Sequence, residues 1–192
     1  MALGTGNNQD ELDRAFPAAA HAKLGTLLVE ILAGYNALVA RLNSVVLSKA
    51  GLVIKAGSSA VVKAGVAFAA VVGGTIVRKA ANTDMAALVG TLATANSAAW
   101  AFYINEAGTL SASAKTANAA SHAAAIALLP ATPLDVALIG FIVVDNATGS
   151  NFVGGTTALD TASLTVTYYD SSGIPPGLAT VGIEALGDIN SR

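Results

Sequence analysis

The sequence predicts a mainly β protein with an N-terminal α-helix, organised as a trimeric coiled-coil-like stem followed by a small β-sandwich or barrel. Two observations carry this prediction. Apolar residues recur between positions 24 and 45 at alternating spacings of four and three, which is the repeat of a coiled coil. Beyond Gly51 the period changes to short β-branched runs separated by glycines, which is typical of short strands and turns.

The chain divides into four parts: an N-terminal arm (1–16), an oligomerisation helix (17–49), a β-domain (50–170) and a C-terminal tail (171–192). Pro17 suits the first turn of the helix, where its missing N–H is not needed. We expect the helix to stop by Lys49-Ala50-Gly51, where a cation in the last turn is followed by a glycine able to adopt positive φ. The tail is expected to become ordered on a partner, with a disordered terminus as the equally simple alternative.

The a and d positions of the heptads hold seven apolar residues: Leu24, Leu28, Ile31, Tyr35, Leu38, Leu42 and Val45. Because a straight helix drifts by about 20° per heptad, such a stripe stays aligned only when helices supercoil around one another. Leucine at a with a β-branched residue at d, as in Leu28/Ile31, favours three or four strands over two. We therefore predict a homotrimer with these seven residues in its interface.

An amphipathic helix packed on its own domain is the alternative, because a pattern of three heptads also arises by chance. Gly25 and Gly34 count against a stable stem, since each costs roughly 1 kcal/mol of helix stability relative to alanine. The register places His21 at a. A ring of imidazoles there would hold water or an anion, although a solvated histidine at a frayed helix start is the simpler expectation.

The β-domain is expected to consist of short strands and turns. Its predicted strands lie within Val53–Gly57, Val61–Gly65, Val66–Val72, Thr75–Lys79, Trp100–Asn105, Thr109–Ser113, Val136–Asp145 and Ser163–Tyr169. The clearest hairpin runs through Glu106-Ala107-Gly108, a loop of suitable length that ends in glycine. Two alanine-rich stretches, Asp84–Leu92 and Ala117–Leu129, are helical or irregular in this interpretation. The expected core residues are Trp100, Phe102, Phe141 and Phe152.

The composition is unusual: 54% of the residues are hydrophobic and only 11% are charged, against about 25% charged in a typical soluble domain. Much of the exterior is therefore serine, threonine, asparagine and alanine, or is covered by other subunits. Residues 14–79 hold eight Lys/Arg against Glu30 alone, and residues 80–191 hold eight Asp/Glu against Lys115 alone. One interpretation is that this asymmetry orients the molecule toward an acidic partner. The alternative is that the charges only keep a surface with few charged residues in solution.

Membrane and nucleic-acid partners are not expected. No stretch reaches the roughly 18 consecutive apolar residues of a membrane span, and the N-terminus lacks the features of a signal peptide, so synthesis in a cytoplasm is expected. An isoelectric point near 5.5, with Arg78-Lys79 as the only adjacent basic pair, argues against a phosphate-binding surface.

No catalytic, cofactor-binding or metal-binding residues are expected. The chain has two histidines and no cysteine, and it contains neither HExxH, a calcium-binding loop nor a phosphate-binding glycine motif. His122 follows Ser121, but no acid lies near it in the sequence, so it is interpreted as an ordinary surface histidine.

Two strings in the β-domain are distinctive: Leu-Ile-Gly-Phe-Ile-Val-Val at 138–144 and Asn-Phe-Val-Gly-Gly-Thr-Thr-Ala-Leu-Asp at 151–160. Residues 50–170, which contain them, resemble virion structural proteins of tailed bacteriophages. This resemblance implies a non-enzymatic homotrimer of the capsid-decoration, cement or head-fibre type. It would be made in the host bacterial cytoplasm and located on the capsid surface, with the major capsid protein or another virion protein as its partner.

Two other functions are compatible with the sequence. One is a tail-fibre or receptor-binding module that contacts host surface glycans. The other is a cell-wall hydrolase carried on the virion, whose turnover would depend on an acid such as Asp145 or Asp160. The segment from Phe152 to Asp160 is interpreted as a glycine-rich turn that positions a buried phenylalanine, in preference to a receptor-contacting loop.

Overall fold

The structure, a computed structural model, describes residues 18–171 of the chain. The predicted arm, Pro17 and the tail from residue 172 lie outside the described residues, as do the side chains of His21 and Leu42. The chain divides into two units, Met1–Val39 and Ala40–Arg192. The predicted class is confirmed at the coarse level, because an N-terminal helix is followed by several antiparallel sheets. The described strands do not close into a barrel.

Helix α2 (Ala18–Leu42) is shorter at its C-terminal end than the sequence predicts. Val45–Val46 forms strand β1, which pairs with Val71 and Ala70. Val46 is thereby buried to 1% exposure in the core. The prediction of Val45 as a helical seam residue is therefore wrong: strand pairing and burial of the next residue outweigh two further turns of helix.

Four antiparallel strands form the largest sheet, in the order β11-β9-β7-β8. Their bounds are β7 (Asn96–Asn105), β8 (Leu110–Ala112), β9 (Val136–Asn146) and β11 (Leu164–Asp170). The predicted hairpin through residues 106–108 is confirmed: the Gly108 N–H donates to the Asn105 carbonyl at 2.9 Å, and Gly108 has φ +79°. Strand β9 pairs on both sides and is buried on both faces along most of its length, as its continuous apolar run predicts.

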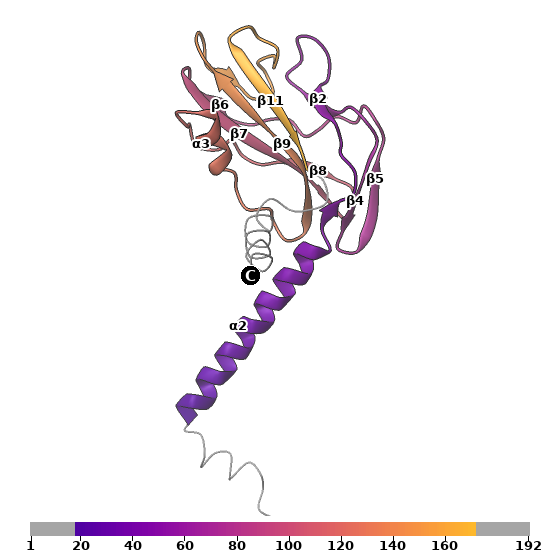
Figure 1. The fold of residues 1–192 in the computed structure, drawn as a ribbon, viewed down its shortest axis with the longest axis vertical. Coiled ribbons are helices and arrows are strands. Elements are labelled where there is room, and N and C mark those ends of the chain that lie inside the picture. Colours follow the sequence, from indigo (N-terminus) through magenta and orange to yellow (C-terminus); the bar gives the residue numbers. More distant parts are fainter. Residues whose placement is uncertain (1–17, 172–192) are drawn as a thin grey trace, which may run out of the picture. The chain divides into compact units, whose positions relative to one another are not determined.

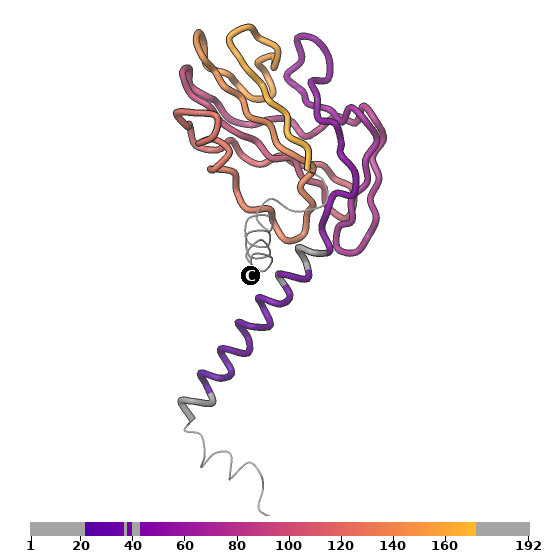
Figure 2. Tube along the Cα trace, viewed as in Figure 1, coloured from indigo at the N-terminus to yellow at the C-terminus, as the bar shows by residue number. Residues whose placement is uncertain are grey.

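The other strands form smaller sheets, and Figure 2 traces the chain through them. Strands β1, β4 (Phe68–Val72) and β5 (Thr75–Lys79) form a three-stranded sheet in the order β1-β4-β5. The remaining pairs are β2 (Leu52–Ile54) with β3 (Val62–Ala64) and β6 (Thr91–Leu92) with β10 (Phe152–Val153). A short helix, α3 (His122–Ala127), lies beside β7 in Figure 1 and packs on the four-stranded sheet.

The main core contains side chains from the inner faces of the four-stranded and three-stranded sheets. Trp100, Phe102 and Phe152 are completely buried in it. The Trp100 and Phe152 rings meet edge to face, with centroids 5.7 Å apart. The indole N–H of Trp100 donates to the Val89 carbonyl at 3.0 Å, so this buried donor is satisfied.

Phe141 is not part of the main core, contrary to the prediction. Successive side chains of a strand point to opposite faces, so Ile142 and Val144 enter the main core while Phe141 lies on the other face of β9. There it is half-buried and stacks on Tyr169, with ring centroids 4.6 Å apart.

Gly140, directly before Phe141, is required by close packing. A Cβ at this position would overlap the Tyr169 carbonyl of β11 and lie 2.7 Å from Leu52 Cδ1 of β2. Such a separation is well inside van der Waals contact. The glycine therefore lets β2 and β11 approach the middle of β9. The side chain of Asp170 adds a hydrogen bond there, accepting from the Leu52 N–H at 3.1 Å.

Alanine substitutions of Phe152 and Phe141 should lower the free energy of unfolding by different amounts, because Phe152 lies in the main core and Phe141 lies on the other face of β9. We expect Phe152→Ala to lower the free energy of unfolding by about 3–5 kcal/mol, because it leaves a cavity beside Trp100. The matched variant Phe141→Ala should cost clearly less, because its ring is only half-buried. Urea unfolding followed by Trp100 fluorescence measures both, and equal losses would contradict this assignment of faces.

Candidate association surface and polar cluster

Helix α2 exposes the predicted apolar seam. Five of the seven residues have exposed side chains, with exposed fractions between 46% and 62%: Leu24, Leu28, Ile31, Tyr35 and Leu38. The side chain of Leu42 lies outside the described residues, and Val45 belongs to β1. The five side chains recur one helical turn apart, so they share one face of α2.

We define the apolar arc as these five residues together with Leu27 and Leu32, which flank them. The arc is wider than a seam made only of a and d positions. Leu27 occupies g and Leu32 occupies e, and both are exposed. The charged residues Lys23 and Glu30 occupy c, next to the border of the arc that Leu27 forms. The arc therefore covers more of the helix surface than the a and d positions alone.

A second feature is a polar cluster on the outer face of the four-stranded sheet, formed by His122, Asp145 and Tyr169. The His122 ring lies between the other two side chains: Nδ1 is 2.7 Å from Asp145 Oδ2, and Nε2 is 2.9 Å from the Tyr169 hydroxyl. Ser121 caps α3 by accepting from the Ala124 N–H, which fixes the position of His122 at the helix start. All three members are partly buried.

The interpretation of His122 as an ordinary surface histidine is therefore wrong. Asp145 and Tyr169 are 23 and 47 residues away in the sequence, and pairing of β9 with β11 brings them together. Period-two alternation places Asp145 on the same face as Phe141, and this is the one sequence signal that points toward the cluster. Nothing local to His122 indicates either partner.

The geometry of the cluster is that of a carboxylate, a base and a hydroxyl in a chain. A neutral imidazole satisfies both contacts when Nδ1–H donates to Asp145 and Nε2 accepts from the tyrosine hydroxyl. Asp145 Oδ1 is buried without a protein hydrogen bond, and Asp145 also borders a shallow, open depression with Asn96, Ser97 and Asn146. The cluster joins α3, β9 and β11, and so it ties the short helix to the sheet.

The other acid considered for catalysis, Asp160, has a structural role. Its Oδ2 accepts from the Ser58 N–H at 2.8 Å, and Ser58 has φ +60°. The carboxylate therefore supports a tight turn between β2 and β3. Within residues 18–171, no three metal-ligating side chains gather at one place.

Burial changes the acidity of three side chains. Burial raises the pKa of Tyr103, and it also raises that of Tyr168, to which the charge of Asp160 contributes further. Burial lowers the pKa of Lys115, whose ammonium group donates to the Thr116 carbonyl and to Asn118 Oδ1. The two phenols therefore stay neutral to higher pH than a free tyrosine, and the two hydrogen bonds hold Lys115 against its own loop.

Comparisons with family models, curated proteins and solved structures give no match. Within the described part of the chain, no helix has both the length and the apolar character needed to cross a membrane.

A double-mutant cycle should detect the coupling between His122 and Tyr169. We expect Tyr169→Phe and His122→Ala each to lower stability by about 1 kcal/mol, because each removes a hydrogen bond from a partly buried group. The double variant should cost less than the sum of the two, by about 0.5 kcal/mol or more. Chemical denaturation measures the cycle, with Tyr103→Phe paired with His122→Ala as an additive control. Strict additivity of the first pair would show that the cluster is not a unit.

Proposed function

We propose that the chain is a non-enzymatic structural component of a tailed-bacteriophage virion. In this proposal it is a homotrimer whose α2 helices form a coiled-coil stem and whose β-domain is a small β-sandwich. The trimer decorates or stabilises the capsid, in the manner of a cement or head-fibre protein, with the major capsid protein or another virion protein as its partner. The observation that carries the proposal is the exposed apolar arc of α2.

Exposure of the arc favours self-association on energetic grounds. Full burial of a leucine or isoleucine side chain contributes roughly 1.5–3 kcal/mol relative to full exposure, and the five seam residues are each about half exposed. Each therefore gains on the order of 1 kcal/mol when a neighbouring helix covers it. A threefold arrangement covers every copy equally, as is usual for homo-oligomers with closed symmetry.

Two further observations support a virion component. The strings that resemble phage structural proteins form the centre of β9 and the segment that begins with β10. In the second string Phe152 is buried, and a Cβ at Gly154 would lie 2.9 Å from the Leu88 carbonyl carbon, which fits a packed turn. The low proportion of charged residues, 11%, suits a protein whose surface contacts many neighbouring subunits.

Substitution in the arc tests the stem. We expect Ile31→Asp to convert the trimer to monomer, because a charge buried in an apolar seam without a partner costs several kcal/mol per chain. The matched control is Ala33→Asp, which adds the same charge on the opposite side of α2 at another exposed position. Sedimentation of Ile31→Asp as an unchanged trimer would refute the stem.

Labelling of intact particles tests the virion assignment. Gold-labelled antibody against the β-domain should decorate the capsid in electron micrographs. Label at the tail tip, together with binding of the isolated protein to host cells, would favour the receptor-binding alternative. Absence of label on disrupted and intact particles would overturn the assignment altogether.

The hydrolase alternative rests on one observation, the hydrogen bonds that join Asp145, His122 and Tyr169. A peptidoglycan zymogram tests it directly, with Asp145→Asn as the variant and Asp160→Asn as the matched control. The structural proposal expects no clearing by any of these proteins. Clearing by the wild-type protein that is lost only in Asp145→Asn would overturn the non-enzymatic assignment.

A further inference from the structure

The outer face of the β1-β4-β5 sheet carries a second exposed apolar surface. Strand register places Val45, Val71 and Ile76 in one row across the three strands. Leu47, whose N–H donates to the Ala69 carbonyl at 2.8 Å, extends the surface by one row. Ile76 is 59% exposed and Leu47 is 53% exposed. We call these four residues, Val45, Leu47, Val71 and Ile76, the basal patch.

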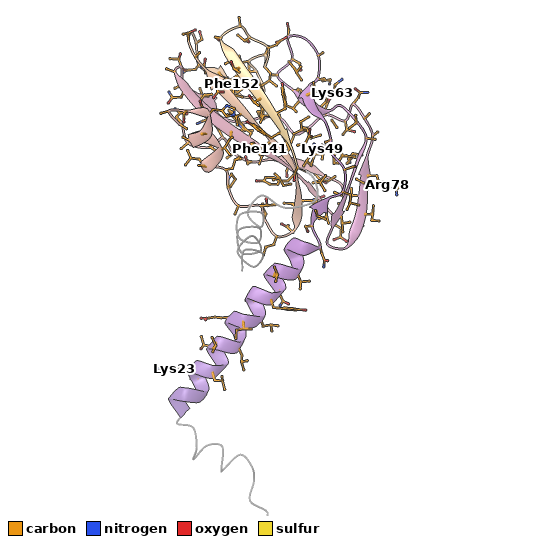
Figure 3. The ribbon with its side chains drawn as sticks, viewed as in Figure 1. Lys23, Lys49, Lys63, Arg78, Phe141 and Phe152 are labelled. Carbon is orange, nitrogen blue, oxygen red and sulfur yellow. The ribbon has the colours of Figure 1, made fainter. Side chains whose placement is uncertain are left out.

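The basal patch is unusual for a sheet whose other face is already in the core. Val46, Ala70 and Val72 are the inward residues of the same strands, and all three are buried. An antiparallel sheet that faces water on one side usually carries polar side chains there. Here Arg78 is the one charged residue among the outward positions of β4 and β5, and Figure 3 shows it pointing away from the sheet.

The chain brings the basal patch close to the stem. Val45 follows Leu42, the last residue of α2, after two intervening residues. Three residues of extended chain span about 10 Å at most. If three copies of α2 gather around an axis, the three copies of β1 must lie within that reach of the end of the stem.

We propose that the basal patch packs against the same sheet of the neighbouring copies, so that the trimer interface continues from the stem into the β-domain. This inference rests on the proposed trimer. Its occupant is a second copy of the chain, because the patch adjoins the stem in the sequence and holds valine, leucine and isoleucine side chains. Arg78, in the same row as Leu47, is the one charged side chain beside the patch, whereas a glycan is recognised by several hydrogen-bonding groups.

Cross-linking of single cysteines tests this inference, and the chain has no cysteine of its own. Ile76→Cys and Leu47→Cys report on the basal patch, and Ile31→Cys reports on the stem. Val89→Cys is the control, because Val89 is 66% exposed and lies outside the sheet. With a short bismaleimide on the full chain, we expect covalent dimers from the first three variants and monomer from Val89→Cys.

The outcomes separate the two proposals. Cross-linking of Ile31→Cys without cross-linking at either basal position overturns the basal contact and leaves the stem intact. Failure at all three positions, together with sedimentation as a monomer, overturns both. As a second measurement, Ile76→Lys should weaken trimer assembly at least tenfold, whereas Val89→Lys should leave it unchanged; equal effects would contradict the inference.

Discussion

The constraint on which the proposed architecture depends is that the apolar arc of α2 is exposed in the described part of the chain. Leucine and isoleucine side chains exposed to this extent lose the transfer free energy that burial provides. Isolated helices are also marginal in water, and Gly25 and Gly34 weaken this one further. Both facts favour a helix that is stabilised by its neighbours in an assembly. The proposed trimer, its stem and the proposed basal contact all rest on this one requirement.

The packing of the β-domain is organised around β9. This strand pairs with β7 along its whole length and with β11 along more than half of it. One of its faces supplies the main core around Trp100, and the other supports α3 and the His122 cluster. Because both faces are used, Gly140 is needed where β2 and β11 come closest. The β-domain therefore has a self-sufficient core, which the helix lacks.

The sequence predicts local features well. The turn through residues 106–108, the strand from Thr75 to Lys79 and the continuous apolar run of β9 all follow from short-range patterns. The end of the helix cannot be predicted in the same way, because Val45 and Val46 pair with residues of β4 that lie 26 and 24 positions further along the chain. Phe141 is expected in the core but lies on the other face of β9, since an apolar run gives no information about which face holds the larger core. The contacts of His122 with Asp145 and Tyr169 likewise cannot be predicted from local sequence, because they depend on the pairing of β9 with β11.

The mass of the full chain in solution tests the central claim most directly. Sedimentation equilibrium over a wide range of protein concentration gives this mass without any variant or label. The account predicts a species of three times 18.9 kDa that persists on dilution to the micromolar range. A single species of 18.9 kDa at the highest concentration would show that the chain does not associate through the arc of α2, and it would contradict the account.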